Sequence, residues 1–196
     1  MKHVNYNIKQ NCENQIIIKK SKFLSFSYAV NNVLEVESIL KEKTDNFFDA
    51  THICYAYILN SGEKKCVDNG EPSGTAGKPI LDVLEKKNLV DVVIVVVRYF
   101  GGIKLGSGGL LRAYSQSASE VVKKSEVCEF VETKSVNIFL NIDETKYLEK
   151  IKKNDKINNI IIDYGNKISV EFTFVKENEL EIKDFLENLL SRTVEF

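Results

Sequence analysis

The fold is decided by the stretch from Val92 to Ala118, which reads VVIVVVRYFGGIKLGSGGLLRAYSQSA. Its first six residues form an unbroken apolar run, mostly valine. Such a run predicts a central strand that is covered on both faces. The run ends at Arg98 in a glycine-rich segment, and a helical pattern resumes at Leu110. We therefore predict a strand, a glycine loop and a helix in that order.

The glycine loop is typical of an anion site at a helix N-terminus. Glycine lets backbone N–H groups approach a ligand closely, and the helix dipole favours negative charge there. Three cations, Arg98, Lys104 and Arg112, flank the loop. The alternative is a structural turn in which Arg98 is paired with an internal carboxylate. The spacing fits neither GxxxxGK[ST] nor GxGxxG with a ribose-binding acid, which excludes a Walker or Rossmann site.

Composition limits the classes of partner. The chain has 196 residues, with 27 Lys and Arg against 28 Asp and Glu, so any contact with a polyanion must be local. We expect no sequence-specific DNA binding. No apolar run is long enough to cross a bilayer, and no secretory signal is recognisable, so we expect no membrane association. The four cysteines lack CxxC pairing, which favours a reduced, cytoplasmic location: Cys12, Cys54, Cys66 and Cys128.

The segments before this stretch alternate between strands and helices. We predict an antiparallel pair at 15–18 and 23–28, separated by a basic cluster of Lys19, Lys20 and Lys22. Asn31 or Asn32 is expected to cap the helix that follows. Further along, we predict strands at 51–59 and 63–67 and a helix at about 79–87.

A second glycine-rich helix entrance lies between Asp68 and Pro79, with Lys78 beside it. Two such entrances in one domain strengthen the hypothesis of a ligand site. Asp68 and Glu71 are candidates for a magnesium site or for acid–base chemistry. The alternative is that they accept loop N–H groups or pair with Arg98.

His52 and Cys54 lie two apart on the predicted strand 51–59, so their side chains share one face. A histidine and a thiol are half of a zinc site or a nucleophile with its base, but no further His or Cys pair completes either arrangement. We therefore expect a small buried Cys54 and a structural or loop-contacting His52.

The C-terminal part has a different pattern. After a strand at 127–133, we predict strands at 135–142, 157–164, 167–175 and 193–196, with helices at 143–153 and 178–190, the first capped by Asp143. The order β-α-β-β-α-β is that of a ferredoxin-like domain. We expect two domains, 1–133 and 134–196, with the chemistry in the first.

Three motifs carry a family resemblance: DATHICYAY at 49–57, DNGEPSGTAGKPIL at 68–81 and VVVRYFGGIKLGSGGLLRAY at 95–114. In order and spacing they resemble the YigZ/IMPACT family, in its bacterial YigZ-like branch, over essentially the whole chain. One departure is Asn69, where many relatives have a second aspartate. The matching positions are Asp49, His52, Cys54, Asp68, Gly70, Glu71, Pro72, Gly74, Thr75, Gly77, Lys78, Pro79, Arg98, Tyr99, Phe100, Gly101, Gly102, Leu105, Gly106, Gly108, Gly109 and Ala113.

The resemblance implies an α+β fold of two domains. The N-terminal domain is expected to be of the ribosomal protein S5 domain 2 type, similar to domain IV of elongation factor G and to the ribonuclease P protein. The C-terminal domain is expected to be ferredoxin-like, similar to domain V of the same factor.

We expect a non-enzymatic, translation-associated protein that binds RNA or a ribosomal surface through a local basic patch. Tyr99, Phe100 or Tyr114 would stack on an unpaired base if exposed. No cofactor, metal or catalytic residue is expected. The alternatives are an enzyme whose glycine loops hold a small phosphorylated ligand, and a protein-interaction module that uses the C-terminal sheet. The expected anion- or nucleic-acid-binding residues are Lys78, Arg98, Tyr99, Gly101, Gly102, Lys104, Gly106, Ser107, Gly108, Gly109 and Arg112.

Overall fold

The predicted central strand is β6 (Val92–Tyr99), the middle strand of a five-stranded antiparallel sheet. The computed structural model describes residues 5–165 and 167–196. In the register of the sheet, Val95 of β6 lies opposite Phe26 and Tyr55 on its two neighbours. The sheet has the order β2-β3-β6-β4-β5, with β2 (Cys12–Ile18), β3 (Ser21–Ala29), β4 (His52–Ile58) and β5 (Lys64–Val67).

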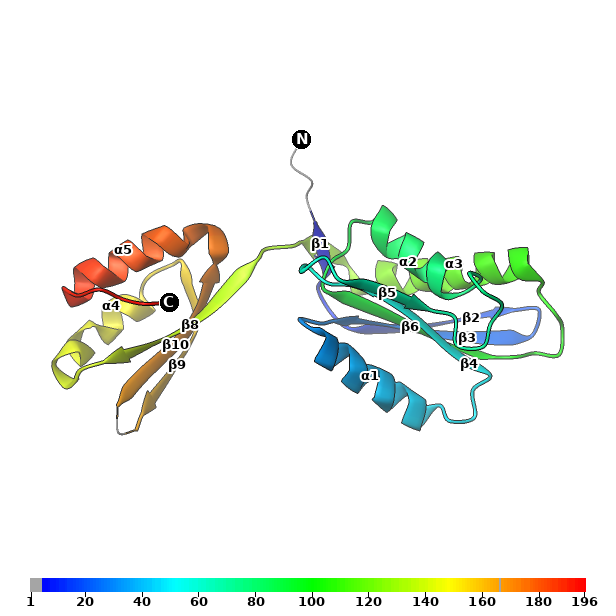
Figure 1. Ribbon diagram of the computed structural model, residues 1–196, viewed down its shortest axis with the longest axis horizontal. Helices are drawn as coiled ribbons and strands as arrows, with labels where there is room; N and C mark the ends of the chain where they lie inside the picture. The colour runs from blue at the N-terminus through cyan, green and yellow to red at the C-terminus, as the bar shows by residue number, and fades with distance from the viewer. Residues whose placement is uncertain (1–4, 166) are drawn as a thin grey trace. The chain divides into compact units, whose positions relative to one another are not determined.

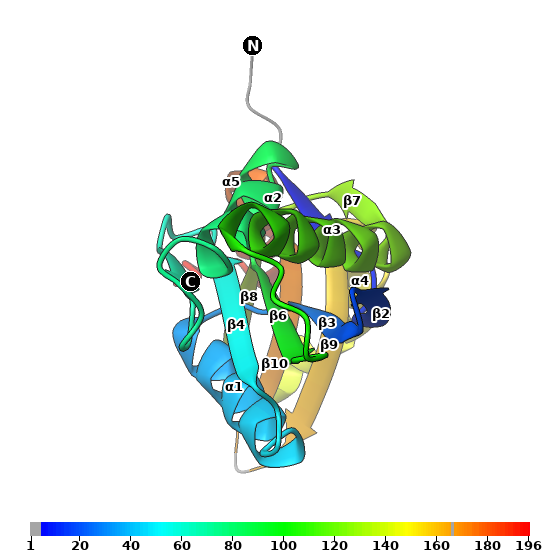
Figure 2. The same cartoon turned by 90° about the vertical axis from the view of Figure 1, so that its right-hand side faces the viewer.

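Helices cover both faces of this sheet, which explains the continuous apolar run of β6 (Figure 1). Ile94 and Val96 pack on side chains of α2 (Gly77–Lys86) and α3 (Ser107–Ser125). Val93 and Val95 face the opposite side, in a cluster with Val36 of α1 (Val33–Asn46). Figure 2 shows α1 on one side of the strands and α2 with α3 on the other. Each such buried side chain contributes roughly 1.5–3 kcal/mol relative to exposure.

The β2–β3 connection is a two-residue turn made of Lys19 and Lys20. Both residues have positive φ, 45° and 65°. Positive φ at both central positions defines the type I′ hairpin turn, which strongly prefers Asn-Gly because a side chain there meets its own backbone. Two lysines therefore occupy a turn whose backbone disfavours them.

The same unit contains a second, two-stranded sheet. β1 (Tyr6–Ile8) pairs with β7 (Val127–Glu129). β7 is shorter than the strand predicted at 127–133, and β1 was not predicted because three residues give no periodicity.

The polypeptide divides into two compact units, Met1–Phe130 and Val131–Phe196. Both mix helices and strands, so the predicted α+β class is confirmed. The second unit has a three-stranded antiparallel sheet of order β8-β10-β9. Its elements are β8 (Thr133–Leu140), η1 (Ile142–Tyr147), α4 (Leu148–Lys152), β9 (Ile157–Tyr164), β10 (Ile168–Val175), η2 (Lys176–Asn178) and α5 (Glu179–Leu190).

Two local predictions in the second unit are wrong. The helix predicted from Asp143 begins as the 3-10 turn η1, and its cap is Asn141, whose backbone N–H donates to the Glu144 carboxylate at 2.8 Å. The segment 193–196 is not a strand. Instead Arg192 donates to the Phe139 carbonyl at 2.6 Å, and the Val194 N–H donates to the Glu187 side chain. The described residues at this end of the chain are thus held by side-chain contacts.

Among the residues that the structure describes, no helix has both the length and the apolar content needed to cross a membrane.

Candidate functional site

Arg98, at the end of β6, is buried. Ile94, Val96 and Arg98 are each two residues apart in the strand, so their side chains share one face of the sheet. This is the face that α2 and α3 cover. Its side chain is 6% exposed, and its Nη1 donates to Glu71 Oε1 at 2.5 Å. The rings of Phe23 and Phe100 lie 5.5 and 5.6 Å from its guanidinium carbon. The prediction that Arg98 belongs to an exposed anion-binding patch is wrong, because a guanidinium on a covered face requires an internal carboxylate.

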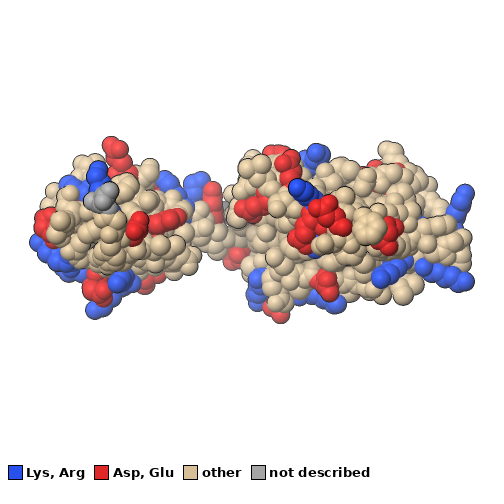
Figure 3. All heavy atoms as spheres, turned by 90° about the horizontal axis from the view of Figure 1, so that it is seen from below, with Lys and Arg blue, Asp and Glu red and all other residues tan. Residues whose placement is uncertain are grey.

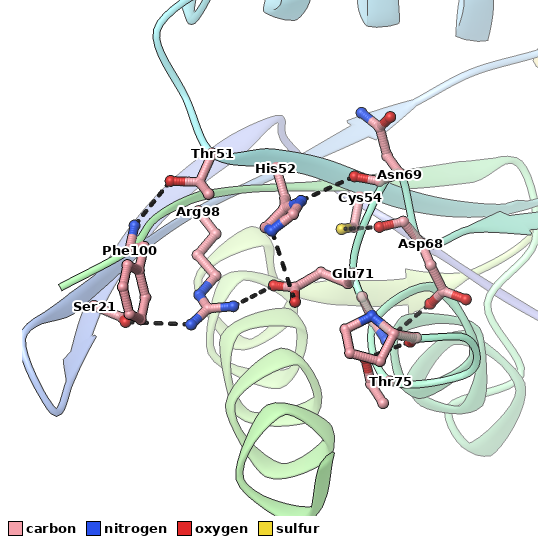
Figure 4. A network of polar contacts seen from close by, with 12 residues as sticks. Ser21, Thr51, His52, Cys54, Asp68, Asn69, Glu71, Thr75, Arg98 and Phe100 are labelled. Atoms are coloured by element: carbon pink, nitrogen blue, oxygen red, sulfur yellow. Dashed lines mark hydrogen bonds and ion pairs between the residues drawn. The ribbon is translucent and has the colours of Figure 1, made fainter. Parts of the chain in front are cut away.

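Glu71 is the centre of the buried polar network (Figure 4). Its Oε1 accepts from Arg98 and from the Tyr114 hydroxyl, the latter at 2.8 Å. Its Oε2 lies 3.8 Å from Nε2 of His52. Three segments far apart in the sequence are thus joined by one carboxylate. Tyr114 is fully buried, so it is not available to stack on a base.

His52 and Cys54 hold the loop that precedes α2. His52 Nδ1 lies 3.0 Å from the Asn69 carbonyl, and the Cys54 thiol donates to the Asp68 carbonyl at 2.9 Å. Burial raises the pKa of the Cys54 thiol to about 12, although a hydrogen bond with the Tyr114 hydroxyl acts in the opposite direction. The thiol is therefore protonated at neutral pH, whereas the nucleophilic form of cysteine is the thiolate. The predicted burial of Cys54 and the predicted loop contact of His52 are confirmed.

The entrance to α2 is occupied by a carboxylate of the protein itself. Asp68 accepts hydrogen bonds from the N–H groups of Gly74, Ala76 and Gly77 at 2.7, 2.9 and 2.8 Å. Partial burial would raise the pKa of Asp68, but these three donors outweigh it and lower the pKa. A Cβ on Gly77 would lie 2.5 Å from the backbone nitrogen of Val67, so only glycine fits there. This entrance is a closed internal anion site.

Lys78, at the same entrance, is already paired. Its Nζ lies 2.8 Å from Asp82 and 3.5 Å from Glu85 on the next turns of α2. Both partners share its helix face, so the charge of Lys78 is offset locally. Lys78 lines neither of the hollows described next.

The entrance to α3 opens on a cavity of about 460 Å³, here called the Phe100 hollow. Its apolar wall consists of Pro72, Phe100, Leu105 and Leu110, and Lys104 and Ser107 lie at the start of α3. Thr51, His52, Glu71 and Arg98 also line it. No side chain in the described ranges caps α3.

The cations at this entrance differ from Lys78. Lys104 and Arg112 are exposed, and neither has an ion pair with any carboxylate in the described part of the chain. Arg112 lies outside the Phe100 hollow, in a second cavity of about 280 Å³ that it shares with Lys19, Gly109 and Gln116, here called the Arg112 hollow. Leu105 lines both hollows. Figure 3 shows Lys and Arg side chains gathered at the right-hand end of the first unit.

Several of the predicted site residues have structural contacts. The Tyr99 hydroxyl donates to Asp49 at 2.8 Å. Gly101 packs so closely on the Lys20 carbonyl that a Cβ there would overlap it, and Gly102 and Gly106 have positive φ. The structure therefore brings Lys104, Gly106 and Ser107 together in the Phe100 hollow and leaves Lys78 outside it. Arg98 lines the same hollow, but its charge is paired with Glu71.

Sequence reasoning missed three members of the site. Ser21 Oγ accepts from the Gly101 N–H at 3.1 Å, and Thr51 Oγ1 accepts from the Phe100 N–H at 2.9 Å. These two hydroxyls fix the loop after β6 to β3 and to the residue before β4. Lys19 was noticed only as part of a basic cluster, and its place beside Arg112 depends on tertiary structure. Neither Ser21 nor Thr51 carries a signal in local sequence.

Comparison with known proteins supports the three-motif resemblance. Residues 19–122 match the family model described as the Impact N-terminal domain. The chain is 38% identical over 184 residues to the IMPACT family member YvyE of Bacillus subtilis, covering 91% of this chain and 83% of that protein. It is 35% identical over 111 residues to the IMPACT family member YigZ of Escherichia coli, covering 55% of this chain and 54% of that protein.

A solved structure shares the fold of the whole chain. A crystal structure described as that of a hypothetical protein superposes with a TM-score of 0.71 at 22% identity, covering 100% of this chain and 99% of the other. This similarity concerns the fold alone.

Proposed function

The chain belongs to the IMPACT family, and on that premise we propose that it is a translation-associated protein that binds single-stranded RNA, on the ribosome or free, through the Phe100 hollow. It acts by binding rather than by catalysis. A cytoplasmic location is part of this proposal and is supported by four free cysteines. The finer domain types, S5 domain 2-like for the first unit and ferredoxin-like for the second, remain proposals.

The observation that carries the proposal is the combination of chemistries in the Phe100 hollow. The start of α3 and Lys104 attract a phosphate, because uncapped N–H groups and an unpaired ammonium both favour negative charge. Phe100, at 46% exposure, offers a ring face beside them. A base stacked on a ring next to a bound phosphate is the usual pattern of single-strand recognition. An acidic protein surface would use the cations but not the ring.

Co-sedimentation with ribosomes and with ribosomal RNA across a salt series tests the proposal. Wild type should pellet with both at low salt and less at moderate salt. Lys104→Ala/Arg112→Ala should lose most of this binding. Lys86→Gln/Lys87→Gln, which removes two positive charges at the other end of α2, is the matched control and should bind as wild type does. Binding that does not change with salt concentration, or that persists in the Lys104→Ala/Arg112→Ala variant, would contradict the proposal.

A second candidate follows from the size of the Phe100 hollow. A cavity of about 460 Å³ is in the range that holds a small phosphorylated ligand. A screen of nucleotides and sugar phosphates, with and without magnesium, would then raise the thermal midpoint of unfolding, since a ligand selective for the folded state stabilises it. If no compound shifts the midpoint while RNA still binds, this candidate is eliminated.

A further inference from the structure

We propose that the Lys19–Lys20 turn and Arg112 form a second phosphate site, which holds the next part of the RNA strand that the Phe100 hollow binds. This inference rests on the proposed function and extends it. It assigns the β2–β3 turn, which lies far from the glycine motifs in sequence, to the binding surface.

The turn has lysines where its backbone favours other residues. Lys19 and Lys20 both have positive φ in a two-residue hairpin loop, for which Asn-Gly is the preferred sequence. Both side chains are exposed, and neither has a hydrogen bond or ion pair with any described residue. Folding therefore gains nothing from these two side chains that the preferred turn sequence would not supply. A conflict between local preference and the residue present is typical of a functional position.

The turn is held firmly against the glycine loop. Gly101 lies on the Lys20 carbonyl with no room for a Cβ, and its N–H donates to Ser21 Oγ, the first residue after the turn. Figure 2 looks onto this end of the first unit, where the loop after β6 runs beside β3. The two lysines therefore have a fixed place next to the loop that leads to α3.

The Arg112 hollow joins the turn to α3. Lys19 comes from the turn, whereas Arg112 and Gln116 come from successive turns of α3, and no acidic residue lines this hollow. An ideal Cβ on Gly108 would lie 4.0 Å from Arg112 Nη1, so the guanidinium reaches back over the first turn of the helix. Arginine and lysine donors without a carboxylate partner suit a phosphate.

The two hollows are adjacent, because Leu105 lines both. The single acidic side chain in the Phe100 hollow, Glu71, is neutralised by Arg98. A strand whose base lies on Phe100 and whose phosphate lies at Lys104 can therefore continue over Leu105 to Arg112 and Lys19. Successive phosphates of a single strand match this alternation of apolar and cationic surface.

The test replaces the turn by its preferred sequence. Lys19→Asn/Lys20→Gly removes both charges and keeps, or improves, the turn. Binding of a fluorescein-labelled oligouridine is followed by fluorescence anisotropy over a salt series, beside thermal unfolding. We expect a higher thermal midpoint together with weaker binding, and the slope of log K against log salt should fall by up to about 0.7, the contribution of one single-strand phosphate contact.

The outcomes separate this inference from the proposed function. Oligouridine binding that is lost in Lys104→Ala but unchanged in Lys19→Asn/Lys20→Gly overturns the second site and leaves the first. An equal loss in the control Lys86→Gln/Lys87→Gln also overturns it, because the effect would then be one of net charge. If wild type binds neither oligouridine nor ribosomal RNA, the proposed function fails and the second site fails with it.

Discussion

The two glycine-rich helix entrances of this protein have similar sequences and opposite electrostatics. At α2 the carboxylate of Asp68 accepts three backbone N–H groups, and the neighbouring Lys78 is paired within its own helix. At α3 no described side chain caps the helix, and Lys104 has no carboxylate partner among the described residues. The first entrance already contains its anion, whereas the second is open to an anion from outside. Glycine content alone does not distinguish an internal site from a binding site.

The largest expected effect concerns the buried pair that supports both entrances. Glu71→Ala leaves the Arg98 guanidinium buried without its carboxylate, which should cost about 3–5 kcal/mol of the free energy of unfolding. Urea denaturation measures this. Glu85→Ala is the matched control, because Glu85 pairs with Lys64 and Lys78 at the surface and should cost less than about 1 kcal/mol. Equal costs for the two substitutions would show that the Glu71–Arg98 pair is not structural.

A smaller loss is expected at the closed entrance. Asp68→Asn keeps the shape of the side chain but removes the charge that three N–H groups share, and it should cost about 2 kcal/mol. Asp82→Asn, on the exposed face of α2, is the control and should change the free energy of unfolding by about 0.5 kcal/mol or less. An unchanged stability in Asp68→Asn would mean that water replaces the carboxylate without cost.

The open entrance can be closed by design. Ser107→Asp places a carboxylate in the first turn of α3, where it should stabilise the helix by up to about 1 kcal/mol and weaken oligouridine binding. Ser107→Asn is the matched control, because it has the size of Asp without the charge, and it should weaken binding less than Ser107→Asp does. Thermal unfolding measures the change in stability, and fluorescence anisotropy measures the change in oligouridine binding. If Ser107→Asp binds RNA as wild type does, the start of α3 is not the phosphate site.

The smallest expected effect is a dependence of the free energy of unfolding on pH in the acid range. The pKa of Asp68 is lowered in the folded protein from an ordinary value of 3.8. The stability contributed by Asp68 is therefore fully present above pH 3.8 and is lost as pH falls through the folded pKa, because the unfolded chain binds the proton first. Asp68→Asn should lose stability less steeply than wild type over this acid range in pH-dependent denaturation. Parallel curves for the two proteins would contradict the assignment.

Much of the first unit could be predicted from sequence because its signals are local. The apolar run of β6, the capping asparagine of α1, which is Asn32, and the glycine-rich starts of α2 and α3 all follow from periodicity and turn chemistry. In the second unit, the prediction of a strand at 193–196 was wrong. The side chains of Arg192 and Glu187 make the contacts there, and side-chain contacts of this kind leave no local pattern.

The site was harder to predict because the state of a charge depends on tertiary contacts. Arg98, Lys78 and Lys104 look alike in sequence, since each lies within three residues of a glycine. Only the fold shows that Glu71 neutralises the first, that Asp82 neutralises the second and that the third is exposed. The place of Lys19 beside Arg112 depends on a hairpin that returns to the glycine loop from far away in the chain.

The central claim is that an external phosphate binds at the start of α3 and not at the start of α2. A titration of the ¹⁵N-labelled protein with oligouridine, followed by NMR, tests it directly. The account predicts saturable, salt-sensitive shifts of the amide signals of Ser107, Gly108 and Gly109, with those of Gly74, Ala76 and Gly77 unmoved. Shifts at the α2 entrance alone, or at neither entrance while RNA still binds, would contradict it.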